Sequence, residues 1–197
     1  MNPQEISHDP HARLVFAHNE LRAHLHGLLR ASRLMLLGRG DFALAPVIAK
    51  ALRFLAVDVP LHARDEEESM LPRLRAKLKD PQSHFAYLLE HIEKDHEELA
   101  ALQRDFDACA RKLSARLPLE GAAKRGQLEP ELKQFREHLA KLLLIYDSHM
   151  KVEERDLFPA LAVVFTPDER SAIAAEMDER RPQNAVSMNP ALATRSA

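Results

Sequence analysis

Apolar residues recur along most of the chain at spacings of three and four, which is the repeat of an amphipathic α-helix. Four long segments carry this pattern, and their expected ranges are 10–37, 42–79, 81–117 and 129–164. Two of them begin with a recognisable start signal. Asp9-Pro10 and Asp80-Pro81 each provide an N-cap followed by proline at the first helical position. We therefore expect four long helices joined by short or moderate connections.

Prolines and caps add detail to this pattern. Pro60 removes a backbone donor inside the second segment and predicts a kink there, and Pro72 predicts a further bend or fraying. Residues 166–169 read Thr-Pro-Asp-Glu, a capping box that predicts a short fifth helix over 167–179. Residues 181–197 contain prolines and small residues without an apolar period, so we expect a disordered or loosely packed tail.

The predicted fold class is all-α. Long amphipathic helices with these connections are typical of an up-down antiparallel four-helix bundle, here with a short extra C-terminal helix. We expect one domain over residues 1–180, followed by the tail at 181–197. The composition agrees, because the 197 residues include only five glycines and no tryptophan, whereas good helix formers are abundant.

Charge and cysteine content narrow the function classes. The formal net charge of −2 offers no strongly basic surface, so a nucleic-acid partner is not expected. The chain has no apolar run long enough for a membrane span and starts without a basic-then-apolar signal segment, so a membrane partner is not expected either. The single cysteine, Cys109, excludes an intrachain disulfide. We expect a cytoplasmic protein.

A duplicated motif is the strongest chemical signal. His62 and Glu66 stand four residues apart, as do His149 and Glu153. In both copies a second glutamate follows the first, proline comes ten residues after the histidine, and leucine two residues later. On a helix, residues four apart share one face with Cβ atoms about 5–6 Å apart. An imidazole and a carboxylate so placed can bind one metal ion together.

Two further histidines lie at the same expected height in the bundle. Counted from turns near residues 40, 80 and 124, His18, His62, His96 and His149 are level to within about one helical turn at a rise of about 1.5 Å per residue. All four lie in or beside the apolar stripe of their helix. A single buried histidine is most often a core imidazole that is hydrogen-bonded to a neighbour. Four at one level with two glutamates need a common partner, because burying six unpaired polar groups costs several kcal/mol.

A pair of metal ions is such a partner. Imidazoles and carboxylates together suit iron, manganese or zinc better than calcium or magnesium. Two glutamates that can each bridge favour two ions over one. The predicted ligands are His18, His62, Glu66, His96, His149 and Glu153.

The neighbouring acids are expected outside this ligand set. Glu67 and Glu154 come five residues after their histidines and are turned from them by about 140° on a regular α-helix. We expect them to support the ligands from behind or to lie in solvent. Tyr146, one turn before His149, is expected in the core with its hydroxyl near the site.

The duplicated phrase resembles the hemerythrin-like family of cation-binding helical bundles, and the likeness covers about residues 10–165. Ferritin-type sites differ, because they place glutamate first and histidine three residues later. The resemblance implies that the same six residues bind two non-haem iron ions, with Glu66 and Glu153 as bridges. It also implies that His18 and His96 are the single ligands of the first and third helices.

One departure from the family pattern affects the expected function. Oxygen-carrying hemerythrins have two histidines four apart on the third helix, whereas Ile92 stands four residues before His96 here and His91 stands five before. The pattern therefore favours a protein that binds or senses O2, NO, or iron and redox state over a reversible oxygen carrier. Two alternatives stay open: a di-iron enzyme for peroxide or NO detoxification or iron-centre repair, and an interaction module stapled by metal.

Overall fold

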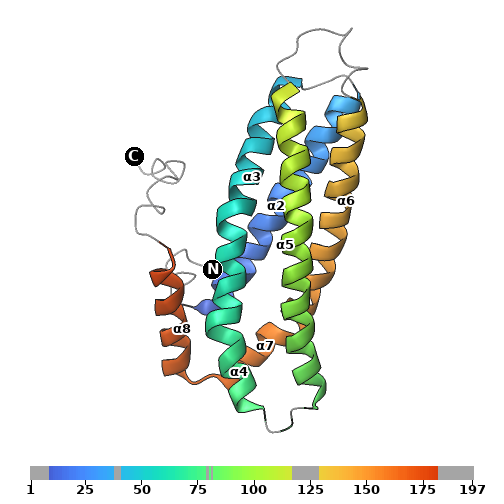
Figure 1. The fold of residues 1–197 in the computed structure, drawn as a ribbon. Helices are drawn as coiled ribbons and strands as arrows, with labels where there is room; N and C mark the ends of the chain where they lie inside the picture. The colour runs from blue at the N-terminus through green and yellow to red at the C-terminus, as the bar shows by residue number, and fades with distance from the viewer. Residues whose placement is uncertain (1–8, 38–40, 79, 81, 117–128, 182–197) are drawn as a thin grey trace, which may run out of the picture.

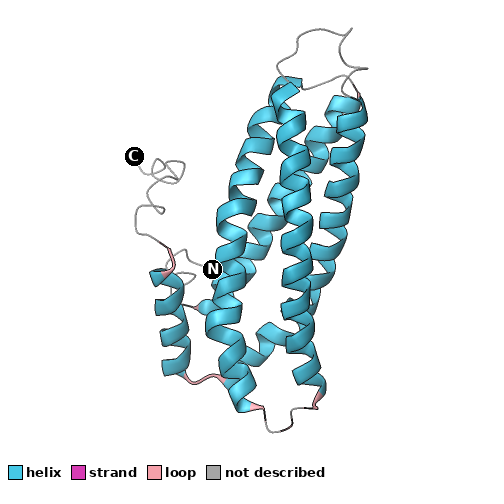
Figure 2. Ribbon diagram, in the orientation of Figure 1, coloured by secondary structure: helices cyan, strands magenta, loops and turns pink. Residues whose placement is uncertain are grey.

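A computed structural model describes residues 9–37, 41–78, 80, 82–116 and 129–181. The regular elements in these ranges are all helical, as Figure 2 shows, and none of the described residues forms a β-strand. The predicted all-α class is therefore confirmed. The elements are α2 (Pro10–Leu36), α3 (Asp41–Arg64), η1 (Asp65–Met70), α4 (Leu71–Lys77), α5 (His84–Arg116), α6 (Glu129–Val152), η3 (Glu153–Leu157), α7 (Phe158–Val164) and α8 (Pro167–Glu179). The tail predicted at 181–197 lies outside the described residues beyond Arg181.

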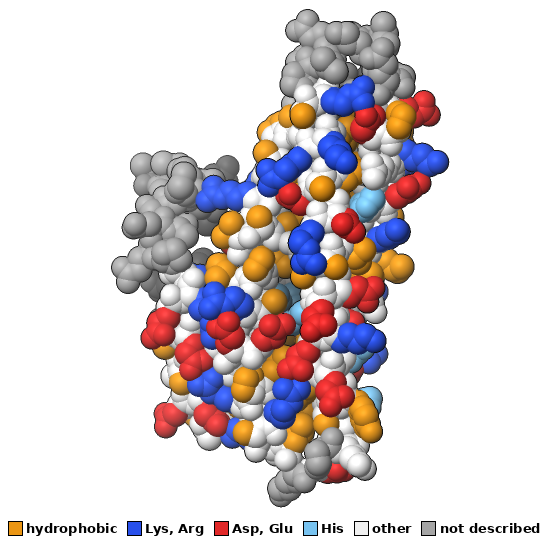
Figure 3. Space-filling view, viewed as in Figure 1, with side chains coloured by type: hydrophobic (Ala, Val, Ile, Leu, Met, Phe, Trp, Pro, Cys, Tyr) orange, Lys and Arg blue, Asp and Glu red, His pale blue; other side chains and the backbone are white. Residues whose placement is uncertain are grey.

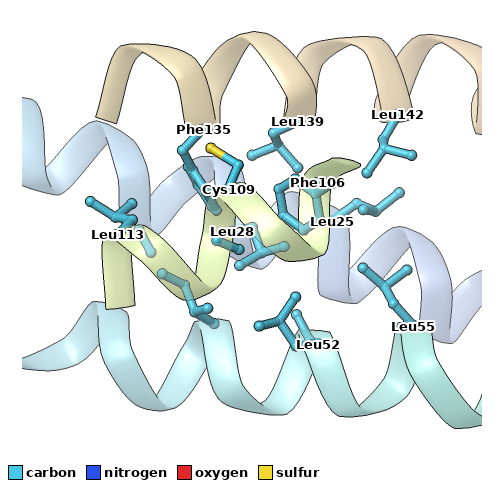
Figure 4. Close-up of a cluster of buried hydrophobic side chains, with 14 of the residues drawn as sticks. Leu25, Leu28, Leu52, Leu55, Phe106, Cys109, Leu113, Phe135, Leu139 and Leu142 are labelled. Carbon is cyan, nitrogen blue, oxygen red and sulfur yellow. The ribbon is translucent and has the colours of Figure 1, made fainter. Parts of the chain in front are cut away.

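The four long helices lie side by side with their axes roughly aligned, as Figure 1 shows. Contacts join α2 to α3, α3 to α5, α5 to α6 and α6 to α2, so the four helices enclose a common interior. Leucine and phenylalanine side chains from all four point into it (Figure 4). The short helices α7 and α8 lie toward one end, where α8 packs on α2 and η1.

The interior contains two apolar clusters, and the candidate histidines lie between them. On α2, Leu14 belongs to one cluster and Leu21 to the other, with His18 midway. On α5, Ile92 and Leu99 flank His96 in the same way. The polar level that the sequence predicts is therefore a boundary between two dry regions of the core.

The second and fourth predicted segments are not single α-helices. Each changes to a π-helical stretch that contains the glutamate of the histidine motif, Glu66 in η1 and Glu153 in η3, and then resumes as α4 or α7. The carbonyl of Glu66 accepts the N–H of Leu71, and that of Glu153 accepts the N–H of Phe158, five residues along in both cases. Proline follows immediately in each copy, and its ring would clash with the carbonyl four residues back in a regular α-helix. The wider turn ahead of the proline relieves that clash, whereas α3 continues through Pro60.

The third helix begins later than predicted. Its first residue is His84, because the Asp80 carboxylate accepts the backbone N–H of Gln82 and the Asp80 carbonyl accepts that of Ser83, which makes a turn. The hydroxyl of Ser83 then accepts the N–H of Ala86 and caps the helix. The prediction of a start at Pro81 was therefore wrong by three residues, since an aspartate can stabilise a turn as readily as a helix end.

The fifth helix agrees with the prediction. Thr166 and Glu169 form the reciprocal capping box at the start of α8, which runs over Pro167–Glu179. Its buried residues Ile173 and Met177 join the apolar cluster below the histidines. Among the described helices, none is both long and apolar enough to cross a membrane.

Candidate metal centre

The structure brings all six predicted ligands to one place. Two groups of four residues each offer one ligand atom per residue, and within a group these atoms lie within 4.8 Å of one another. The first group is His18, His62, Glu66 and Glu153, and the second is Glu66, His96, His149 and Glu153. The two glutamates belong to both groups.

Each glutamate directs one oxygen toward each group. Glu66 Oε1 lies 3.3 Å from His62 Nε2, and its Oε2 lies 3.2 Å from His96 Nε2. Glu153 Oε2 lies 3.1 Å from His18 Nε2, and its Oε1 lies 3.2 Å from His149 Nε2. This is the arrangement that two carboxylates need in order to bridge two ions.

The donor set fits metal ions on its own chemistry. Glu66 and Glu153 are both 0% exposed, and none of their four carboxylate oxygens has a hydrogen-bond partner. The nearby histidine nitrogens are close enough but lack hydrogen-bonding geometry, as is usual for ligands that face one ion. Two buried, unpaired carboxylates cost several kcal/mol unless a cation compensates them.

Carboxylates behind the site orient three of the four histidines. Glu154 lies 2.9 Å from His18 Nδ1 and Glu67 lies 2.7 Å from His96 Nδ1. Asp95 lies 3.3 Å from His149 Nδ1. In each pair the Nδ1–H donates to the carboxylate, which leaves Nε2 directed at the centre as the atom that could bind a metal. Such pairs fix the ring and increase its basicity toward a metal.

His62 is the exception. Its Nδ1 is buried without a hydrogen-bond partner, and its Nε2 lies 2.9 Å from Nε2 of His18. In a hydrogen bond between two imidazole nitrogens one must donate, so only one of the pair can direct a free lone pair into the centre. A metal ion bound by both Nε2 atoms would remove this conflict.

Burial and mutual charge shift the ionisation of these groups. Burial raises the pKa of Glu153 well above its usual value, and the charge of Glu66 adds to this increase. Burial also acts to raise the pKa of Glu66, but the neighbouring His62 and His96 outweigh it, so the pKa of Glu66 is lowered. Burial lowers the pKa of His62 to about 3 and that of His149 to about 4, so both imidazoles are neutral at neutral pH. Burial also opposes a charge on His96, but two adjacent carboxylates raise its pKa to about 9. Metal binding would therefore displace protons from the centre.

The supporting acids were only partly predicted. Glu67 and Glu154 were expected behind the ligands or in solvent, and the structure places both behind a histidine of another helix. Asp95 was missed, although it immediately precedes His96 in the sequence. Tyr146 is 3% exposed and donates its hydroxyl to Gln103, at 2.7 Å. His91 points outward with its side chain 59% exposed.

The fold and the site together define an all-helical protein with a buried cluster of histidines and glutamates suited to metal cations. Residues 9–161 match the family model described as the Hemerythrin HHE cation binding domain. The chain therefore belongs to the hemerythrin HHE family, and the resemblance seen in its duplicated motif is confirmed. Comparison with curated proteins and with solved structures found no match.

Proposed function

We propose that this protein binds a carboxylate-bridged pair of non-haem iron ions and uses them to bind or sense O2, NO, or the iron and redox state around it. In this proposal the four long helices form the antiparallel up-down bundle of the hemerythrin type. Membership of a cation-binding family supports the metal, and the mixed imidazole and carboxylate ligands favour iron, with manganese or zinc as substitutes.

One observation carries the dinuclear part of the proposal. Each glutamate presents one oxygen to the histidines of α2 and α3 and the other to those of α5 and α6. A site for one ion would need neither two complete groups nor two carboxylates shared between them. Six residues can give each of two ions four protein ligands, which leaves coordination positions for a small molecule.

The side chains around the centre prepare it for this role. A bridged iron pair, when bound, supplies a change of redox state and positions for a diatomic ligand. The chain itself supplies four oriented or buried imidazoles, two buried carboxyl groups that a bound cation would keep ionised, and apolar clusters on both sides along the bundle. In a dry site these charges act strongly on any bound ligand.

The third helix favours sensing over reversible oxygen carriage. His91 lies outside the cluster, so α5 contributes His96 alone, and each group then contains two histidines. The proposed ligand sets are therefore matched in number. A second histidine on the third helix, as in an oxygen carrier, would give one ion more histidine ligands than the other. Among the described residues, the two groups have equal numbers of histidines.

Anaerobic reconstitution with ferrous iron tests the proposal. Elemental analysis should reach two equivalents per chain, and the optical spectrum should change when O2 or NO is added. A plateau at one equivalent would contradict the dinuclear centre. Sustained turnover of peroxide or NO would favour the enzymatic alternative. A spectrum that does not change with either O2 or NO would favour a metal that only stabilises the fold.

A further inference from the structure

A cavity of about 340 Å³ lies against the histidine side of the candidate centre. It opens between α3 and α5, and Figure 3 shows pale-blue histidine atoms inside the opening, about midway along the molecule. All four candidate ligand histidines line it. The rest of its lining is mainly apolar, with Leu21, Val59, Leu99 and Met150 inside and the exposed Pro60 and Ala100 at the mouth.

The cavity is much larger than a diatomic ligand requires. An engineered apolar cavity of about 150 Å³ in another protein holds benzene, and one water occupies about 30 Å³ of the liquid. The present volume of about 340 Å³ is more than twice the benzene cavity. It also falls within the range of about 300–1,000 Å³ that is typical of small-molecule sites. O2 or NO alone would leave most of this space unfilled.

Apart from the histidines, the uncharged polar side chains in the wall already have hydrogen-bond partners in the protein. The Tyr146 hydroxyl donates to the side-chain oxygen of Gln103, and the Gln103 amide donates to the carbonyl of Leu55. Three charged residues line the cavity, Arg64, Glu67 and Glu97. All three are exposed, and the Glu67 carboxylate already accepts from His96 Nδ1–H. An uncharged apolar molecule could therefore enter without stranding a hydrogen-bonding group, whereas a charged one would lose its hydration.

We propose that this cavity binds a small uncharged organic molecule, about the size of a substituted benzene, with one edge against the four histidines. The proposal rests on the proposed metal centre for what the bound molecule would do there, since it makes an organic compound a partner of the iron pair. Binding itself depends only on the volume and the apolar wall. It can therefore be measured with and without metal.

The probe for this test is 4-fluorotoluene, followed by fluorine NMR on the full-length protein. We expect saturable binding of one molecule per chain to the chelator-treated protein, displaced by toluene and not by equimolar benzoate. Ala63→Phe should fill the cavity beside His62 and weaken binding at least tenfold, and Ala100→Phe should do so from the mouth. Ala140→Phe adds the same bulk at an exposed position of α6 and serves as the matched control.

The outcomes separate this proposal from the proposed function. Absence of saturable binding to the wild-type protein, or equal binding by Ala63→Phe, Ala100→Phe and Ala140→Phe, would overturn it. Circular dichroism establishes that each variant is folded, and Ala100→Phe provides the test if Ala63→Phe is not. Metal content is measured on the same samples. If the protein binds two equivalents of iron but no 4-fluorotoluene, only the proposal of an organic ligand is contradicted. If it binds 4-fluorotoluene but one equivalent of iron or less, only the proposal of an iron pair is contradicted.

Discussion

The half of the candidate centre on α2 and α3 and the half on α5 and α6 present the same ligands in the same order, but their supports differ. His18 and His96 are matched, because each donates its Nδ1–H to the second glutamate of the opposite half. His149 and His62 are not matched. Asp95 pairs with His149, while Ala17 stands at the corresponding place before His18 and His62 Nδ1 has no partner.

A second difference lies on the outside of the same two halves. Asp65, three residues after His62, is 1% exposed and pairs with Arg180 and Arg181 at the end of α8. Val152 occupies the corresponding place after His149. The duplicated ligands are therefore embedded in unlike surroundings, so two ions with equal numbers of protein ligands are expected to bind with unequal strength.

The largest expected effect comes from the shared carboxylates. Glu153→Ala removes an oxygen from both groups, so the two halves should fail together and iron content should fall from two equivalents to one or none. Glu154→Ala removes only the partner of His18 and Arg22, and should keep two equivalents at saturating iron with an affinity about tenfold weaker. Elemental analysis and iron titration measure both.

Glu98→Ala, at an exposed position of α5, is the control for loss of a carboxylate. It should leave both the iron content and the affinity unchanged. If Glu154→Ala lost the metal while Glu153→Ala kept it, the register assigned to η3 would be wrong.

Removal of metal from the wild-type protein should destabilise both halves at once. A ligand at a thousandfold excess over its dissociation constant stabilises the native state by about 4 kcal/mol, which corresponds to a fall in Tm on the order of 10 °C when it is removed. The native state loses the free energy of metal binding, and the carboxyl oxygens of Glu66 and Glu153 are again buried without a partner. Calorimetry before and after chelation measures it, and an unchanged Tm in demonstrably metal-free protein would contradict a buried site.

The unequal supports predict that the two ions bind in separate steps. Asp95→Asn should weaken binding at the α5–α6 position by about 10–100-fold, because His149 loses a charged partner. Ala17→Asp should reduce the difference in affinity between the two binding steps, because it would give His62 a carboxylate partner equivalent to Asp95. Calorimetric titration resolves the steps, and Asp105→Asn, at an exposed position of α5, is the control. Identical single-step titrations of wild type and Asp95→Asn would show that this asymmetry has no energetic effect.

The smallest effect is expected where α8 meets only one half. Arg181→Gln removes one of the two arginines on Asp65, and should cost about 1 kcal/mol and lower Tm by about 2–4 °C. Arg155→Gln breaks an exposed pair with Asp156 and should have less effect. Thermal melts of the two variants compare them directly. Equal melts would mean that the Arg181–Asp65 pair adds nothing measurable to stability.

Much of the site could be predicted because its ligands obey local rules. The spacing of His62 to Glu66 and of His149 to Glu153 follows from the helical repeat, and the apolar stripe indicates which face is buried. Helix lengths then bring His18 and His96 to the same height. These arguments require only residues close in sequence and the assumption of short connections.

The supporting contacts could not be predicted in this way. Glu154 lies 136 residues from His18, and periodicity shows which face of a helix is buried but not which side chain of another helix meets it. The π-helical turns had a signal in the proline that follows each motif, yet a proline is equally compatible with a kink or a helix end.

The sequence by itself determined the helices, the buried faces and the six converging candidate ligands, because these depend on repeats of three and four residues within single segments. Only the tertiary structure decided that Glu67 and Glu154 support histidines of the opposite half, that His62 lacks such a partner, and that a cavity of about 340 Å³ adjoins the four histidines. Those features arise from the packing of side chains on separate helices. No local pattern records such packing, because it depends on the shape of every neighbour at once.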